Sequence, residues 1–222
     1  MISVAIDGPA GAGKSTLSRK VAAALGFIYV DTGALYRAVG FKFINKGADT
    51  ELNVDIDGIL AETKVDIRFV DGEQRVFLDG EDVSDKIRTP EVSMMASAVS
   101  AKPAVRAYLL EMQRKLAREN NVIMDGRDIG TVVLPNATVK IFLTASAEVR
   151  SRRRYDELIQ KNQNVTYKEV YDDMVKRDYN DSHRDIAPLK PAEDSVIADT
   201  SDLDFEQSLE LLLSIIKEKA EI

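Results

Sequence analysis

The sequence predicts an α/β protein: a five-stranded parallel sheet flanked by helices, with a small antiparallel β insert and a helical lid. Short apolar runs alternate with helical patterns along most of the chain, which is typical of β-α units and a parallel sheet. Each apolar run is followed within a few residues by polar or glycine-containing sequence, as expected where such strands end and ligands collect. One segment, residues 64–83, interrupts this alternation and predicts the insert.

The predicted elements follow one another in a regular order. The predicted strands are 2–6, 27–30, 122–124, 139–143 and 195–198. The predicted helices are 14–25, 34–46, 104–119, 146–161, 167–180 and 204–219. In the last helix, apolar residues recur at helical spacing and form one face, which indicates a helix that packs on the core.

Residues 64–83 alternate apolar and polar side chains around the turn-like DGEQ, which predicts an antiparallel hairpin. We expect the hairpin to belong to an insert spanning 48–103. The remaining segments, 1–47 and 104–222, would form the core, and the charged segment 150–165 would form a lid within it.

Composition narrows the class of protein. The chain has 222 residues and 45% hydrophobic residues, enough for one substantial core, and its net charge of −7 disfavours a nucleic-acid polymer as partner. It has no cysteine and one histidine, which excludes thiol catalysis and makes a structural zinc site unexpected. No apolar run approaches the ~20 residues that span a bilayer, and "MISVAIDG" lacks a basic leader region. We expect a cytoplasmic monomer without a membrane partner.

The segment "GPAGAGKST" matches the phosphate-loop pattern G-x-x-x-x-G-K-[ST] between a predicted strand and a predicted helix. Its residues, the predicted ATP-binding set, are Gly8, Pro9, Ala10, Gly11, Ala12, Gly13, Lys14, Ser15 and Thr16. Glycines let backbone N–H groups surround a polyphosphate, and the following helix adds its positive N-terminal end. Lys14 can then reach the β and γ phosphates, and the Ser15 hydroxyl can ligate Mg²⁺.

The phosphate loop leaves the reaction open, because kinases, switches and motors share it. A GTPase needs N-K-x-D, and the near match "NKGAD" at 45–49 places its aspartate one residue late. What the chain has instead is arginine at many predicted loop positions. Guanidinium stays charged and binds two phosphate oxygens at once, which suits the alignment of two phosphates.

The run "RSRRR" at 150–154 has two interpretations. Arg150 and Arg154 share one helix face, so they could form a lid that brings positive charge over the donor phosphates. Arg153 shares a face with Arg150 as well, while Arg152 points elsewhere. The alternative is a solvated basic surface without a role in phosphate transfer.

Asp125 ends an apolar strand that is predicted to run parallel to the strand before the phosphate loop. An acidic residue at that place can orient Mg²⁺ directly or through water. The alternative is an aspartate that caps a helix.

The segments "DGPAGAGKST", "DTGALYR", "DGRDIGTVV" and "RDYNDSHRDIAPL" together resemble the bacterial cytidylate kinases, a family of nucleoside-monophosphate kinases with a phosphate loop. The resemblance runs from the first strand to the final helix and includes the hairpin, where that family carries its monophosphate-binding insert. It implies transfer of the γ-phosphate of ATP to CMP or dCMP with Mg²⁺, giving ADP and CDP or dCDP in pyrimidine nucleotide metabolism.

The resemblance also implies roles for particular residues. The acceptor phosphate would be held by Arg37, Arg127 and Arg184, with the Thr32 hydroxyl beside it. Ser97, Arg106 and Asp128 would read the cytosine ring, and Arg177 and Asp181 would lie near the sugar. The predicted catalytic residues are Lys14, Asp125, Arg127, Arg150 and Arg154, and the predicted metal ligands are Ser15 and Asp125.

The base-reading roles agree with the chemistry of cytosine. A carboxylate accepts from the 4-amino group, while guanidinium donates to N3 and O2. Uracil would turn a carbonyl toward Asp128 and lose that bond. Two alternatives remain open: a kinase of the same fold that phosphorylates UMP or another small acceptor, and a non-enzymatic nucleotide switch.

Overall fold

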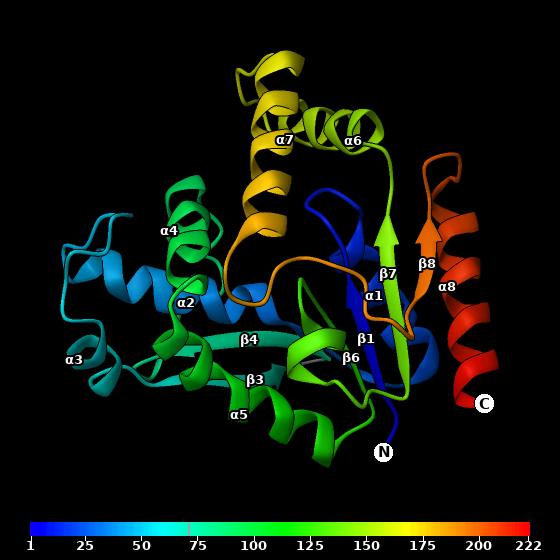
Figure 1. Cartoon of the computed structure of the whole chain (residues 1–222), viewed down its shortest axis with the longest axis horizontal. Helices are drawn as coiled ribbons and strands as arrows, with labels where there is room; N and C mark the ends of the chain where they lie inside the picture. Colours follow the sequence, from blue (N-terminus) through cyan, green and yellow to red (C-terminus); the bar gives the residue numbers. More distant parts are fainter. Residues whose placement is uncertain (71) are drawn as a thin grey trace.

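A five-stranded parallel sheet forms the centre of the computed structural model, which describes residues 1–70 and 72–222 (Figure 1). Its strand order is β2-β6-β1-β7-β8. The strands are β1 (Ser3–Asp7), β2 (Ile28–Asp31), β6 (Val122–Gly126), β7 (Val139–Thr144) and β8 (Val196–Asp199). All neighbouring pairs are parallel, so the five carboxyl ends lie at one edge, and the predicted fold class is confirmed.

Helices cover both faces of this sheet. The helices of the chain are α1 (Lys14–Leu25), α2 (Thr32–Asn45), α3 (Ile56–Ala61), α4 (Pro90–Ser100), α5 (Pro103–Glu119), α6 (Ala147–Gln160), α7 (Tyr167–His183), α8 (Phe205–Ala220) and the short π-helix η1 (Ile129–Val133). Apolar residues of α1 and α8 pack with the sheet in one core cluster. Residues of α5 and η1 pack on other sheet residues in a second cluster.

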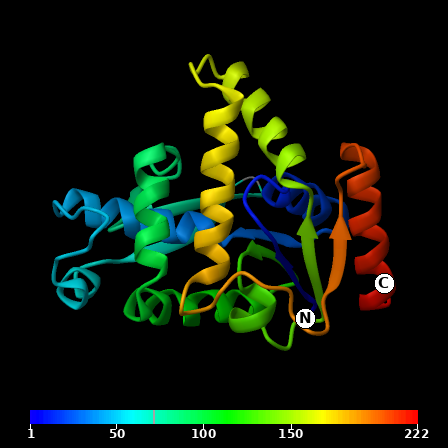
Figure 2. The same cartoon turned by 45° about the horizontal axis from the view of Figure 1, so that its top comes forward.

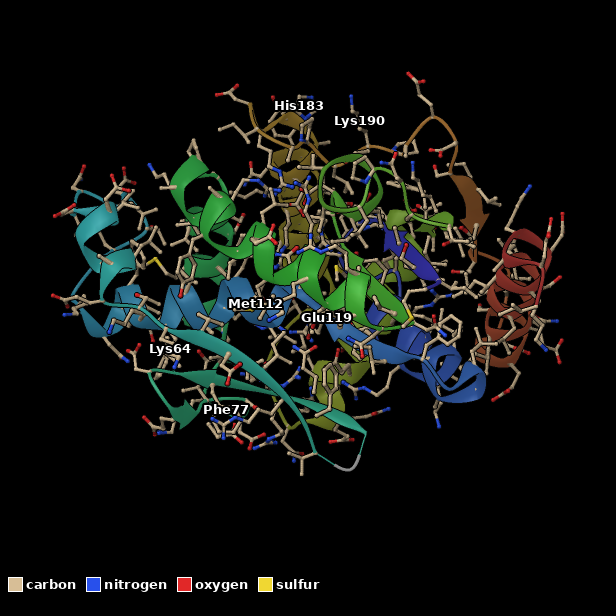
Figure 3. The ribbon with its side chains drawn as sticks, turned by 90° about the horizontal axis from the view of Figure 1, so that it is seen from below. Lys64, Phe77, Met112, Glu119, His183 and Lys190 are labelled. Atoms are coloured by element: carbon tan, nitrogen blue, oxygen red, sulfur yellow. The ribbon has the colours of Figure 1, made fainter. Side chains whose placement is uncertain are left out.

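A second, antiparallel sheet lies in the predicted insert. It consists of β3 (Val65–Val70), β4 (Glu73–Leu78) and β5 (Glu81–Asp82), and β3 pairs with β4 from Val65 opposite Leu78 to Val70 opposite Glu73. Its buried residues join those of α2, α4 and α5 in a third core cluster. Figure 3 shows the hairpin from below, with Lys64 and Phe77 labelled on it. The predicted small antiparallel β insert is confirmed.

The helices α6 and α7 pack against each other and project beyond the carboxyl edge of the central sheet (Figure 2). Each begins at a side-chain cap, Ser146 for α6 and Thr166 for α7, and Thr166 forms a reciprocal capping box with Glu169. The α6–α7 pair extends well past the predicted lid segment 150–165, because α7 continues to His183.

Two helices of the insert region were absent from the sequence-based prediction. In α4, Thr89 accepts a hydrogen bond from the Val92 N–H and Pro90 occupies the first helical position. In α3, Asp55 accepts from the Gly58 N–H. Both are ordinary start signals for a helix, so local sequence carried the information. None of the helices in the described ranges is both long and apolar enough to cross a membrane.

Candidate functional site

The phosphate loop connects β1 to α1 at the carboxyl edge of the central sheet. At Gly8, φ is +153°, and a Cβ there would lie 1.9 Å from the Leu143 carbonyl oxygen of β7. Only glycine fits such a close approach. The Lys14 Nζ donates hydrogen bonds to the carbonyl oxygens of Gly8 and Pro9, both at 2.8 Å, so the loop wraps around its own lysine.

Lys14 is buried, and its surroundings weaken its hold on a proton. Burial, followed by the positive charge of Arg127, lowers the pKa of Lys14 to about 7. Asp125 and Asp7 act in the opposite direction. An added phosphate charge would favour the protonated form, so this lysine is suited to bind an anion.

Asp125 lies beside the loop, within β6. One of its oxygens accepts from the Ser15 hydroxyl at 2.8 Å and the other from the Tyr29 hydroxyl at 3.1 Å. Burial, and next the charge of Asp31, raises the pKa of Asp125 to about 6. Because its oxygens accept from side-chain hydroxyls rather than from backbone N–H groups at the start of a helix, the helix-capping alternative does not describe Asp125. A hydroxyl and a carboxylate in contact are the oxygen donors that Mg²⁺ prefers, so these residues fit that ion.

Most predicted acceptor-phosphate residues lie in carboxylate-paired positions around the same edge. Arg37 pairs with Asp31 at 2.8 Å, and its buried Nε has no partner among the described residues. Arg127 pairs with Asp181 at 2.7 Å. The Thr32 hydroxyl donates to the Asp125 carbonyl oxygen at 2.7 Å, which places it at the end of β6, two residues before Arg127.

The charges of this region interact directly. Burial lowers the pKa of Arg177, and the neighbouring positive charges of Arg127, Arg37 and Arg154 lower it further. Three guanidinium groups, from α2, the segment between β6 and η1, and α6, therefore lie close enough to repel that of Arg177 on α7. Binding of an anion would relieve this repulsion and so lower the free energy of the cluster.

The predicted cytosine-reading residues form a second network next to the arginine cluster. Arg106 of α5 pairs with Asp128, and Arg184 approaches the other oxygen of Asp128 at 3.5 Å. Arg106 also lies 5.8 Å from the centre of the Tyr36 ring. Burial raises the pKa of Asp128, while Arg106 and Arg184 counteract it.

Ser97 lies apart from the Arg106–Asp128 pair. It is exposed on α4 and lines an open pocket of about 330 Å³ together with residues of α7 and the segment after it. Asp181 and Arg184 line the same pocket. The structure therefore brings Ser97 to the predicted sugar and phosphate residues across a gap rather than into hydrogen-bond contact.

The arginines of "RSRRR" point in different directions. Arg150 is buried and donates to the Ala10 carbonyl oxygen of the phosphate loop at 2.9 Å, while pairing with Asp178 at 2.7 Å. Arg154 is half exposed and pairs with Glu157 on its own helix. Arg153 donates to the Thr200 carbonyl oxygen, and Arg152 lies 4.4 Å from the centre of the Tyr167 ring.

Three polar residues near the site were not predicted: Asp7, Gln74 and Arg114. Asp7 accepts from two backbone N–H groups of η1, Gln74 bonds the backbone of Asp31, and Arg114 donates to two carbonyl oxygens of η1. Asp7 directly precedes the phosphate loop, so the sequence indicated that it lies near the site but not which groups it contacts. Its partners lie 122 and 123 residues away, so no local pattern could reveal them.

Comparison with known proteins identifies close relatives over nearly the whole chain. The family model described as cytidylate kinase matches residues 4–218. The cytidylate kinase of Caldicellulosiruptor bescii is 53% identical over 214 residues, which covers 96% of this chain and 95% of that protein. The cytidylate kinase of Carboxydothermus hydrogenoformans is 49% identical over 219 residues, covering 99% of each chain. An uncharacterised protein from Eubacterium ventriosum has a similar fold, with a TM-score of 0.55, 12% identity and coverage of 98% and 99%.

Proposed function

The chain belongs to the cytidylate kinase family, and from that membership we propose how its residues carry out the family's reaction. The protein is an ATP-dependent kinase that transfers the γ-phosphate of ATP to CMP or dCMP, giving ADP and CDP or dCDP. Neither UMP as acceptor nor a non-enzymatic switch finds support among its relatives. Its monomeric state and cytoplasmic location stay predictions.

The donor half of the proposed site is the phosphate loop. Its backbone N–H groups and Lys14 bind the β and γ phosphates, with Arg150 holding the loop from behind through the Ala10 carbonyl. Ser15 and Asp125 would hold Mg²⁺, which would supply positive charge that stabilises the transferred phosphoryl group. Arg154, on the exposed side of α6, would bind the donor phosphates from the α6–α7 pair.

The acceptor half is the arginine cluster and the Asp128 network. Arg37, Arg127 and Arg184 bind the CMP phosphate, with Thr32 beside it, and Arg177 and Asp181 lie near the sugar. Arg37, Arg127 and Arg184 each pair with an aspartate in the structure. The phosphate therefore replaces or joins an existing ionic partner of each arginine. No general base is needed, because the attacking oxygen is an anionic phosphate oxygen.

The observation that carries the cytosine assignment is the Arg106–Asp128 pair. It presents guanidinium donors and a carboxylate acceptor side by side in a buried position. Cytosine needs both kinds of partner, whereas uracil would face the carboxylate with a carbonyl.

An assay of ADP formation tests the function. We expect turnover with CMP and dCMP that far exceeds turnover with AMP, GMP or dTMP. In Asp128→Asn, kcat/KM for CMP should fall about ten- to a hundredfold, because a mismatched buried polar group costs about 1–3 kcal/mol. The KM for ATP should change little. Equal rates on all acceptors would contradict the assignment of cytosine.

A further inference from the structure

The short π-helix η1 begins immediately after Asp128, and side chains from two distant elements hold both of its ends. Its residues 129–133 follow directly from the carboxyl end of β6 through Arg127 and Asp128. The backbone of Asp128 has φ −147° and ψ 27°, outside the usual helix and strand values. π-helices are rare and occur mostly as single turns, frequently at functional sites.

Asp7 holds the first end. Its two carboxylate oxygens accept from the Ile129 and Gly130 N–H groups, each at 2.7 Å, and the side chain is 4% exposed. These N–H groups open the helical turn and have no partner within it, so the carboxylate satisfies both. Two bonds from one rigid group fix the direction of this backbone as well as its position.

Arg114 holds the other end from α5. Its Nε donates to the Val133 carbonyl oxygen at 3.0 Å and an NH2 group donates to the Val132 carbonyl oxygen at 3.1 Å. Arg106, the partner of Asp128, lies eight residues earlier on the same helix, about two turns away. The helix α5 is seen from below in Figure 3, with Met112 and Glu119 along it. It therefore contacts the segment 128–133 at both ends, through Arg106 and Arg114.

Packing leaves η1 little room to move within this arrangement. A Cβ on Gly130 would meet Lys140 side-chain carbons at 3.2 and 3.3 Å and an Asp7 carboxylate oxygen at 3.4 Å. Ile129 and Val133 are buried in the core cluster that covers one face of the central sheet. A shift of η1 would break hydrogen bonds and packing together, and Asp128 would move with it.

We propose that Asp7 and Arg114 are positioning residues for base selection, which hold η1 so that the Asp128 carboxylate meets the 4-amino group of the acceptor base. This rests on the proposed role of Asp128 in reading cytosine. Neither residue touches the base. Their effect arises because a misplacement of about 1 Å in a recognition group can change a rate about a hundredfold.

The test measures the ratio of kcat/KM for CMP to that for UMP in Arg114→Met, Arg114→Lys and Asp7→Asn. We expect Arg114→Met to lower the ratio about tenfold and Asp7→Asn to lower it as well, with the KM for ATP within about twofold of wild type. Arg114→Lys should recover part of the ratio, since an ammonium still donates to a carbonyl oxygen. Thermal unfolding of each variant is measured alongside.

Two matched controls separate positioning from general loss of stability. Arg118→Met changes another arginine of α5, whose partner is the exposed Glu111. Asp55→Asn changes another carboxylate that accepts a backbone N–H at the start of a short helix, α3. Within residues 1–70 and 72–222, neither side chain forms a hydrogen bond or ion pair with η1, so both variants should keep the CMP to UMP ratio of wild type.

The outcomes are distinguishable. If Arg114→Met and Asp7→Asn lower the unfolding temperature but keep the wild-type ratio while Asp128→Asn collapses it, the positioning role is wrong and the proposed function stands. If Asp128→Asn itself keeps the ratio, the reading of cytosine by Asp128 fails, and the inference fails with it. Should Asp7→Asn not fold, the two Arg114 variants decide.

Discussion

Asp7 and Asp125 are two buried carboxylates at the carboxyl ends of neighbouring strands. Their hydrogen-bond donors differ, and this difference gives the two aspartates different roles. The pKa of each is raised to about 6, in both cases by burial first. Asp7 accepts from two backbone N–H groups, whereas Asp125 accepts from the hydroxyls of Ser15 and Tyr29. The first arrangement is suited to holding backbone, and the second keeps a carboxylate beside the phosphate loop.

The pH dependence of stability should reveal the burial of Asp7. Its pKa rises from 3.8 to about 6 on folding, so the folded protein binds the proton more tightly than the unfolded chain does. This contribution to stability is fully present below about pH 4 and is lost as the pH rises through about 6, with an amplitude of about 3 kcal/mol.

The comparison of wild type with Asp7→Asn isolates that contribution, because asparagine does not titrate. Urea denaturation of both proteins between pH 3.5 and 7 should show the advantage of wild type shrinking as the pH rises from 4 to 6. A difference that stays constant across this range would contradict the assigned direction.

At the scale of elements, the helical pair α6–α7 carries arginines with different surroundings although they are neighbours in the sequence. Arg150 is buried at its base and bonds the phosphate loop, the end of β7 through the Ala145 carbonyl, and Asp178 of α7. Arg154, one turn farther on, is 44% exposed in its side chain. The first connects the helical pair to the phosphate loop, and the second pairs with Glu157 at the surface.

Two substitutions should separate these roles. Arg150→Met breaks a buried ion pair and leaves Asp178 without its partner, so the unfolding free energy should fall by about 3 kcal/mol along with activity. Arg154→Met should lower kcat about tenfold or more while changing the unfolding free energy by less than about 0.5 kcal/mol.

Steady-state kinetics and urea denaturation of both variants check this prediction, with Arg152→Met as the control. Arg152 packs on Tyr155 and Tyr167, so its removal should leave kcat within about twofold of wild type. A wild-type kcat in Arg154→Met would remove that residue from the proposed lid.

At the scale of the whole molecule, one side chain joins the insert to the acceptor half of the site. The Gln74 amide of β4 accepts from the Asp31 N–H at 2.8 Å and donates to the Asp31 carbonyl oxygen at 3.2 Å. The side chain of Asp31 in turn caps α2 through the Ala34 N–H and pairs with Arg37. The insert thereby contacts the residue that orients a proposed phosphate-binding arginine.

Gln74→Leu should weaken this connection. It leaves the Asp31 N–H without its Gln74 partner and removes one of the bonds to the Asp31 carbonyl oxygen, which should cost about 1–3 kcal/mol of unfolding free energy. It should also raise the KM for CMP without changing the KM for ATP, since the phosphate loop lies elsewhere. Glu73→Gln, at the exposed neighbouring position, is the control, and a parallel rise of both KM values would contradict a role confined to the acceptor half.

Local sequence patterns predicted much of the fold. Helix α1 spans 14–25 as predicted. Gly13 precedes its first residue, and the apolar spacing continues to Leu25. Helix α2 begins at Thr32 rather than residue 34, because Asp31 caps it. The π-helix η1 has no such local signal: the side chains that bond the backbone groups at its two ends, Asp7 and Arg114, lie on other elements.

By itself, the sequence determined the order of the predicted strands and helices and the phosphate loop, because these depend on side-chain periodicity and on bonds between near neighbours. Its resemblance to a known family supplied the set of acceptor-binding candidates. Only the tertiary structure decided which candidates meet. Asp128 lies 22 residues from Arg106 and 56 from Arg184, while Arg127 lies 54 from Asp181. Such pairs form only after the sheet has brought β6, α5 and α7 to one edge, and burial there strengthens them, raises the pKa of Asp128 and lowers the pKa of Arg184.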